Sequence, residues 1–240
     1  MGTATMPMES AIRQVPRAVG SVKSLRILLA DDHDLVRRGL RALLEAHPGW
    51  SICAEAQTGR EAVTKAEEER PDIAILDVTM PELNGVEAAR RILKASPNTE
   101  ILVLSVHYSD QLIRDVLDAG VRGCVAKSDS GRDLTIAVEA LANHKPFFTP
   151  RVTELILSNL STKGMSSSGV PEFYGERLTP REREIVQLLS EGMSSKEVAA
   201  MLNISVKTAE THRANIMRKL SMHSVSELVR YAVRNQIIEA

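Results

Sequence analysis

The fold is decided by the stretch Asp72-Ile73-Ala74-Ile75-Leu76-Asp77-Val78-Thr79-Met80-Pro81-Glu82-Leu83-Asn84-Gly85. Its four apolar residues, 73–76, are too few for a helix and indicate a strand buried on both faces of a parallel sheet. The run ends at Asp77, and a loop with proline and glycine follows. Ligands of open α/β sheets bind beyond the carboxyl ends of the strands, so Asp77 lies where a site is expected. An Asp that caps the following helix would fit the same position.

Three further apolar runs end in chemically active side chains. Residues 25–30 are followed by Asp31 and Asp32, residues 101–104 by Ser105, and residues 121–126 by Lys127. One edge of the predicted sheet would therefore gather three carboxylates, a hydroxyl and an ammonium. Clustered carboxylates repel one another, and burial increases the repulsion. A hard cation such as Mg²⁺, which takes carboxylate, water and phosphate oxygens, would relieve it.

Strand and helix patterns alternate through the first part of the chain. Strands are expected at residues 25–30, 51–55, 73–76, 101–104 and 123–126, and helices at about 34–46, 59–69, 85–95, 110–119 and 131–143. This alternation predicts an α/β fold with a doubly wound, five-stranded parallel sheet in the order 2-1-3-4-5.

The residues at these strand ends resemble the receiver domain of two-component response regulators. The resemblance covers residues 25–145 and is carried by Asp31 and Asp32, the Asp77-x-x-Met80-Pro81-x-x-x-Gly85 loop, Ser105 and Lys127. It implies that Asp77 accepts a phosphoryl group, as an acyl phosphate, from a sensor histidine kinase.

The same resemblance implies Mg²⁺ as the cofactor, with Asp31, Asp32, Asp77 and Thr79 as the metal-site residues. Asp32 would bind the ion directly and Asp31 through water. The Ser105 hydroxyl would hydrogen-bond the phosphoryl group, and Lys127 would pair with it. A phosphatase of the aspartyl-phosphate class shares this chemistry. Thr79 replaces the second acid of such an enzyme, so no enzyme activity is expected.

Composition is that of an ordinary soluble protein of one or two domains: 240 residues, 43% hydrophobic and 25% charged. No apolar stretch approaches the ~18–20 residues that a membrane span needs. The first 24 residues lack a continuous apolar core, so no secretory signal is visible and a cytoplasmic location is expected. Cys53 and Cys124 fall in predicted strands, where buried thiols are favoured over a disulfide.

Four regions follow along the chain. Residues 1–24 are expected to be a disordered arm, 25–145 the receiver, 146–176 a helix and a flexible linker, and 177–240 a second domain. In the third region, Thr149-Pro150 predicts a helix start, with the helix running to about Leu160. The last region carries ten Lys and Arg against seven Asp and Glu, whereas the first 176 residues carry 20 against 24. A mildly basic rear domain weakly favours a nucleic-acid partner.

The rear region is helical throughout, which predicts a small all-α domain of four helices. Capping boxes begin at Thr179 and Ser194, and Ser205 and Ser224 are expected to cap the third and fourth helices. Asn203 suits the turn between the second and third helices. Two short capped helices joined by a tight turn indicate a helix-turn-helix.

Residues 178–235 resemble the LuxR-type DNA-binding domain. The resemblance is carried by residues 178–184, the Gly192…Lys196-Glu197-Val198-Ala199 block, Ile204-Ser205…Thr208, His212 and Asn215-Ile216…Lys219-Leu220. With a receiver ahead of it, the chain resembles a NarL/FixJ-type response regulator. This implies a homodimer on double-stranded DNA, with phosphorylation either favouring that dimer or freeing the reading helix. The alternative is a phospho-signalling module whose rear domain binds protein.

The third rear helix is expected to enter the major groove. Ala209, His212, Ile216 and Leu220 should pack inward. The predicted DNA-contacting residues are Lys196, Lys207, Thr208, Glu210, Thr211, Arg213, Asn215, Arg218 and Lys219. The family usually carries Val-Lys at 209–210, so Glu210 makes the operator sequence unpredictable from relatives. The family also commonly has an aromatic residue where this chain has Cys124, which leaves an aromatic switch there in doubt.

Overall fold

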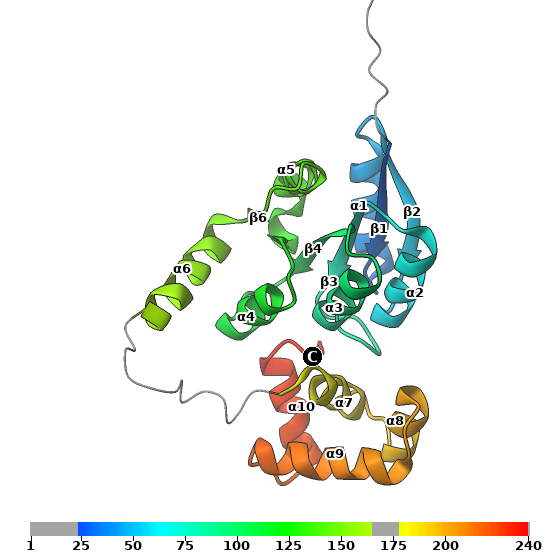
Figure 1. Ribbon diagram of the computed structural model, residues 1–240, viewed down its shortest axis with the longest axis vertical. Coiled ribbons are helices and arrows are strands. Elements are labelled where there is room, and N and C mark those ends of the chain that lie inside the picture. The colour runs from blue at the N-terminus through cyan, green and yellow to red at the C-terminus, as the bar shows by residue number, and fades with distance from the viewer. Residues whose placement is uncertain (1–23, 165–177, 240) are drawn as a thin grey trace, which may run out of the picture.

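The structure, a computed structural model, describes residues 24–164 and 178–239 (Figure 1). Residues 1–23 of the predicted arm at 1–24, and residues 165–176 of the predicted linker, lie outside the described residues. The described chain forms an α/β domain and a smaller helical domain, which contact each other.

The first domain is built on a parallel sheet with the strand order β2-β1-β3-β4-β5-β6. Its strands are β1 Leu25–Ala30, β2 Trp50–Ala56, β3 Ile73–Asp77, β4 Glu100–Ser105, β5 Gly123–Ala126 and β6 Phe147–Phe148. The predicted order 2-1-3-4-5 is therefore confirmed. The sequence pattern missed β6, because two residues are too few to produce a periodic signal.

Helices cover both faces of the sheet, as a doubly wound fold requires. The helices are α1 Asp34–Glu45, α2 Gly59–Glu69, α3 Gly85–Ala95, α4 Asp110–Asp118 and α5 Ser130–Ala142. Leu40 and Leu44 of α1 pack with Leu141 of α5 on one face, whereas Ala66 of α2 and Ile92 of α3 belong to the core on the other face. All five residues of β3 are buried, as the unbroken apolar run predicts.

After the sheet, α6 (Pro150–Gly164) packs against α4. The helix begins at Pro150, where the Thr149-Pro150 pair predicts its start. It continues four residues beyond Leu160, so residues 161–164, predicted as linker, are helical.

The second domain contains α7 Pro180–Ser190, α8 Ser195–Leu202, α9 Val206–Lys219 and α10 Val225–Arg234. Both predicted capping boxes are present, at Thr179 with Glu182 and at Ser194 with Glu197. Asn203 has φ 52°, the left-handed conformation expected of the turn residue between α8 and α9.

The two domains meet through α7 and the end of α10, and α9 lies on the side of its domain away from the receiver (Figure 1). Within the described residues, no helix has both the length and the apolar character to cross a membrane.

Candidate functional site: a phosphoacceptor cluster and an exposed helix

The carboxyl edge of the sheet brings together three of the predicted site residues. Lys127 Nζ lies 2.9 Å from Asp77 Oδ1 and 2.9 Å from Asp31 Oδ2. Asp31 and Asp77 are almost completely buried, and they come from adjacent strands, β1 and β3. The ammonium therefore bridges two buried carboxylates that would otherwise repel each other.

Burial raises the pKa of Asp77 to about 6. Lys127 opposes this change, while the charges of Asp31 and Asp32 reinforce it. Burial also disfavours the charged form of Lys127, but Asp77 and Asp31 outweigh burial and hold the pKa of Lys127 above its ordinary value. The amine is thus a permanent cation beside the candidate acceptor.

The loop after β3 is held tightly against Asp77. A Cβ on Gly85 would lie 2.0 Å from the Asp77 carbonyl oxygen, so only glycine allows this close approach. The Gly85 amide donates to the Val78 carbonyl over 2.9 Å. The glycine of the Met80-Pro81-x-x-x-Gly85 motif therefore determines where the candidate acceptor lies.

Thr79 and Ser105 also border the acceptor. Thr79 Oγ1 donates to Asp77 Oδ2 over 3.3 Å. Ser105 is buried, but its hydroxyl donates to the His107 carbonyl over 2.5 Å instead of contacting Asp77. All the predicted receiver residues thus lie at one edge of the sheet, with the Ser105 hydroxyl turned into its own loop.

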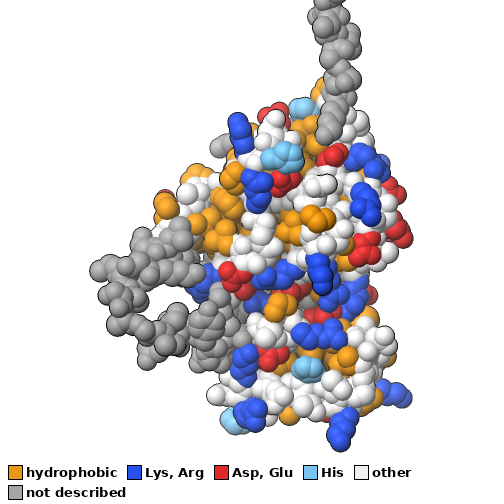
Figure 2. All heavy atoms as spheres, in the orientation of Figure 1, with side chains coloured by type: hydrophobic (Ala, Val, Ile, Leu, Met, Phe, Trp, Pro, Cys, Tyr) orange, Lys and Arg blue, Asp and Glu red, His pale blue; other side chains and the backbone are white. Residues whose placement is uncertain are grey.

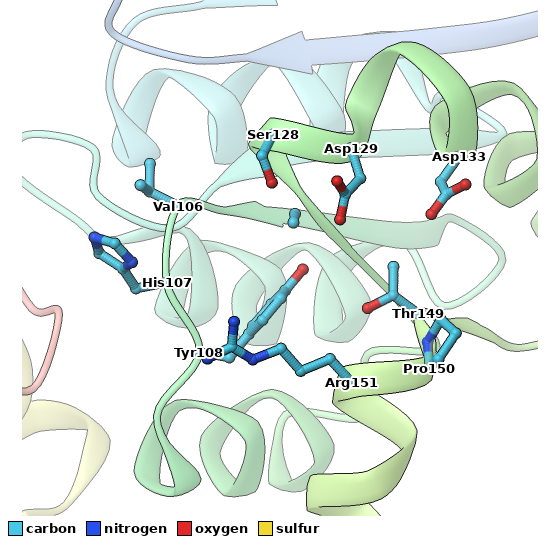
Figure 3. A pocket seen from close by; sticks show the side chains of 10 residues that line it. Val106, His107, Tyr108, Ser128, Asp129, Asp133, Thr149, Pro150 and Arg151 are labelled. Carbon is cyan, nitrogen blue, oxygen red and sulfur yellow. The ribbon is translucent and has the colours of Figure 1, made fainter.

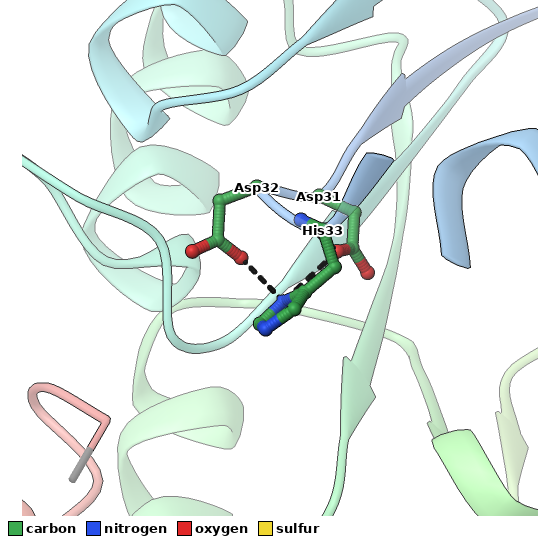
Figure 4. Close-up of side chains that lie close together, drawn as sticks. All are labelled: Asp31, Asp32 and His33. Atoms are coloured by element: carbon green, nitrogen blue, oxygen red, sulfur yellow. Dashed lines mark hydrogen bonds and ion pairs between the residues drawn. The ribbon is translucent and has the colours of Figure 1, made fainter. Parts of the chain in front are cut away.

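His33 is a site residue that the sequence reasoning missed. Its Nδ1 lies 2.9 Å from Asp32 Oδ1 and 3.6 Å from Asp31 Oδ1, and its amide donates to Asp31 Oδ1 over 2.9 Å (Figure 4). The histidine directly follows the acidic pair, and this adjacency was the available signal. Arg37 was missed too: its buried guanidinium donates to the Asp31 carbonyl over 2.8 Å.

The donor set fits a hard cation. Ligand atoms of Asp31, Asp32 and His33 all lie within 4.8 Å of one another. Asp77 adds a third carboxylate, and among the residues that the structure describes Lys127 is the one ammonium that pairs with the buried carboxylates of this cluster. Three carboxylates exceed the charge of one ammonium, and oxygen donors are those that Mg²⁺ prefers.

Tyr108 occupies the space beside Cys124, where the family commonly has an aromatic residue. The tyrosine comes from the loop after β4 and packs against the core cluster that contains Cys124. Burial raises the pKa of Cys124 to about 12. Next to it lies a pocket of about 360 Å³, lined by the tyrosine, Thr149 and Asp129 among others (Figure 3). Cys53 and Cys124 are both free thiols, as predicted, but only Cys124 is buried, and Cys53 is half-buried.

The structure places most of the predicted DNA-contacting residues on the solvent-exposed side of the second domain. Lys196, Lys207, Thr208, Glu210, Thr211, Asn215 and Arg218 are exposed, and Arg213 and Lys219 are half-buried. Lys219 is turned towards α7, where its ammonium lies 2.8 Å from Glu182. Ala209 and Ile216 are buried, as expected, and His212 and Leu220 are half-buried.

Charged side chains hold the two domains together. Glu184 of α7, 2% exposed, lies 2.6 Å from an Arg60 nitrogen and 2.8 Å from an Arg91 nitrogen. Arg183 lies 2.7 Å from Asp115 of α4. Figure 2 shows basic and acidic side chains gathered along this boundary, and further basic side chains project from the lower edge, where α9 runs in Figure 1. The contact therefore covers α7 and leaves α9 accessible.

Both domains match known protein families. Residues 27–139 match the response regulator receiver domain, and residues 176–232 match the LuxR family of bacterial regulatory proteins. The response regulator protein VraR of Staphylococcus aureus is 32% identical over 216 residues, which are 90% of this chain and all of the relative.

Solved structures agree with these matches. A LuxR-family two-component response regulator from Aurantimonas sp. SI85-9A1 is 33% identical, with a TM-score of 0.55 over 57% of this chain and 99% of that one. RcsB from Salmonella enterica serovar Typhimurium, bound to promoter rprA in the presence of the phosphomimetic BeF3-, is 27% identical. Its TM-score is 0.61 over 87% of this chain and 98% of that one.

Proposed function

Because the chain belongs to the LuxR family of two-component response regulators, we propose that a phosphoryl group on Asp77 controls its binding to DNA. One observation carries the proposal: Lys127 bridges the buried carboxylates of Asp77 and Asp31, in a chain that presents α9 to solvent. The protein is a DNA-binding transcriptional regulator, so we infer that its output is DNA binding and not the turnover of a substrate.

The phosphoryl transfer uses the chain's own side chains in distinct roles. An Asp77 carboxylate oxygen attacks the phosphorus of a phosphohistidine on a sensor kinase. The P–N bond breaks as the acyl phosphate O–P bond forms, and the released imidazole nitrogen regains an electron pair that can take a proton. Lys127 balances charge on the phosphoryl oxygens, and the Ser105 hydroxyl turns from its loop to donate to one of them.

Asp31, Asp32, Asp77 and Thr79 would hold Mg²⁺, which supplies further positive charge beside the phosphoryl oxygens. Without it, a phosphoryl group would add negative charge to a cluster where carboxylates already outnumber the ammonium. His33 contacts both Asp31 and Asp32, so it would orient the two carboxylates that this ion needs.

DNA recognition is assigned to α9 in the major groove of double-stranded DNA. Its exposed polar side chains would meet base edges, and Lys196, Lys207, Arg213, Arg218 and Lys219 would contact phosphates. The promoter-bound RcsB structure supports DNA as the partner of this domain. Because chromosomal DNA is the target, we expect the protein to act in the cytoplasm.

Control by dimerisation fits the structure better than unmasking of α9. In the docked arrangement the contacts to the receiver come from α7 and from the end of α10, while the reading residues of α9 are already exposed. Phosphorylation therefore has little to unmask. We infer that it releases the domain so that two copies can pair on DNA.

The test is phosphorylation by acetyl phosphate with Mg²⁺, followed by intact-protein mass measurement. The wild type should gain one phosphoryl group, and Asp77→Asn should gain none, because an amide cannot form an acyl phosphate. Phosphoryl incorporation into the Asp77→Asn protein would show that another residue is the acceptor.

A further inference from the structure

Two side-chain amides of the DNA-binding domain reach the loops beside the phosphoacceptor. Gln187 on α7 is fully buried. Its Nε2 donates to the Met80 carbonyl over 2.8 Å, and its Oε1 accepts from the backbone N–H of Asn84 over 2.7 Å. Gln236, two residues after α10, donates from Nε2 to the His107 carbonyl over 3.0 Å. The rear domain is thus bonded to the main chain of both loops that flank Asp77.

The loop after β3 cannot move independently of Asp77. Its two ends are joined by the bond from the Gly85 amide to the Val78 carbonyl, and Val78 itself donates to Leu104 of β4 over 3.0 Å. The close approach of Gly85 to the Asp77 carbonyl ties the same loop to the acceptor. A side chain that holds the middle of this loop, as Gln187 does, therefore constrains the acceptor.

The loop after β4 carries a second link. The His107 carbonyl accepts a hydrogen bond from Ser105 Oγ over 2.5 Å and another from Gln236 Nε2. To reach a phosphoryl group on Asp77, the Ser105 hydroxyl must leave this carbonyl. In the docked position, Gln236 therefore bonds the same carbonyl that holds the Ser105 hydroxyl away from Asp77, as in the unphosphorylated site.

The domains also meet through ion pairs to helices, and through Glu191 after α7, which accepts a hydrogen bond from the backbone amide of Glu82 in the loop after β3 over 3.1 Å. Glu184 meets Arg60 of α2 and Arg91 of α3, and Arg183 meets Asp115 of α4. These ion pairs contribute to docking without contacting either loop. The two glutamine side chains, together with Glu191, are therefore the contacts made to the loops beside the acceptor.

We propose that Gln187 and Gln236 are positioning residues through which the docked DNA-binding domain holds both phosphoacceptor loops in their unphosphorylated arrangement. This rests on the proposed function of Asp77. Docking then disfavours the phosphorylated site, and phosphorylation weakens docking by the same coupling free energy, because linkage between two equilibria is reciprocal. Docking should also slow phosphorylation, since the Ser105 hydroxyl must leave the His107 carbonyl to reach the phosphoryl group. Glu239 lies in the same C-terminal segment as Gln236, and its carboxylate is 3.8 Å from His33 in the loop after β1.

The experiment compares full-length variants in the rate of phosphorylation by acetyl phosphate at saturating Mg²⁺. Gln187→Met keeps the size of the side chain but loses its two hydrogen bonds to the loop after β3. Gln236→Ala removes the hydrogen bond to the His107 carbonyl in the loop after β4. Each should raise the rate about 5-fold or more, the lower end of typical allosteric coupling. Hydrogen exchange at the Asn84 amide should also accelerate in Gln187→Met, since its acceptor is removed.

Asn235→Ala is the matched control, because the side-chain amide of Asn235 donates to the Tyr231 carbonyl of its own helix and, among the described residues, forms no hydrogen bond to the receiver. It should phosphorylate at the wild-type rate. Thermal unfolding of each variant checks that both domains remain folded. Rates of Gln187→Met and Gln236→Ala that equal or fall below the wild-type rate would overturn the proposal, and so would equal acceleration by Asn235→Ala.

The outcome separates this proposal from the proposed function. If the wild type takes up no phosphoryl group, or takes it up elsewhere than Asp77, the proposed function fails. If Asp77 is phosphorylated normally but the glutamine variants do not accelerate it, only the positioning role fails. Hydrogen exchange at the backbone N–H of Asn84 tests its bond to Gln187 whether or not Asp77 is phosphorylated, since the measurement needs no phosphorylation.

Discussion

The Lys127 ammonium nitrogen lies 2.9 Å from Asp77 Oδ1, so the candidate nucleophile is also an ion-pair partner. The same nitrogen is 2.9 Å from Asp31 Oδ2. One cation thus serves two buried carboxylates, and burial still leaves the pKa of Asp77 at about 6. The buried negative charge of the site therefore destabilises the fold, and a bound cation would relieve this cost.

Replacement of Asp77 by Asn should therefore stabilise the metal-free protein. The folded-state pKa of about 6 lies above the unfolded value of ~3.9. The stability contributed by the protonated acid is full below about pH 4 and is lost as the pH rises through about 6. At pH 7 the loss is on the order of 2–3 kcal/mol by the pKa difference. Urea unfolding in EDTA should show Asp77→Asn more stable at pH 7 and equal to the wild type near pH 4; equal stability at both would contradict this.

Gly85→Ala should displace the acceptor loop. The added Cβ would meet the Asp77 carbonyl oxygen at 2.0 Å, and overpacking of this kind typically costs ~1–3 kcal/mol. Titration with Mg²⁺ should show weaker binding. Gly39→Ala is the control: it has open space around it within α1 and should stabilise the domain by ~0.5–1 kcal/mol. Unchanged metal affinity in Gly85→Ala would count against the role of this glycine.

Glu184→Ala should undock the DNA-binding domain. Its removal leaves Arg60 and Arg91 without their shared carboxylate, and breaking a buried ion pair costs roughly 3–5 kcal/mol. Small-angle X-ray scattering should then give a larger radius of gyration. Glu45→Ala, which removes an exposed partner of Arg41, should leave the radius unchanged. An unchanged radius in Glu184→Ala would mean that the remaining contacts, among them the ion pair of Arg183 with Asp115, are sufficient to hold the domains together.

Glu210→Lys should increase non-specific DNA affinity and steepen its salt dependence. A lysine on the exposed face of α9 adds a phosphate contact, and each contact adds ~0.9 to the slope of log affinity against log salt. If Glu210 reads a cytosine, the native site should also lose ~1–3 kcal/mol of discrimination at that base pair. Selection of binding sites for both proteins decides this, since identical motifs would exclude Glu210 as a reader.

The sequence was sufficient for the order of the first five strands and for the residues at their ends. An unbroken apolar run such as 73–76 indicates a buried strand. The polar residue at the end of such a strand, Asp77 or Lys127, is then expected in the site, because sites form at the ends of parallel strands. The two capping boxes of the second domain were predictable for a similar reason, since each is a local pattern of four residues.

Contacts between distant residues could not be predicted in this way. Gln187 shows no local pattern, and its partners Met80 and Asn84 are more than a hundred positions away. The absence of an aromatic residue at Cys124 was visible, but the packing of Tyr108, from another loop, against the same core cluster depends on tertiary structure. Such contacts depend on which distant residues the fold brings together, and a single sequence does not show this.

The most direct test of the account measures DNA affinity with and without phosphorylation, on genomic fragments at fixed salt. The wild type treated with acetyl phosphate and Mg²⁺ should bind its selected fragments more tightly, and as a dimer, whereas Asp77→Asn should bind equally with and without treatment. Equal affinity of treated and untreated wild type, with Asp77 shown by mass to be phosphorylated, would contradict the claim that this phosphoryl group controls DNA binding.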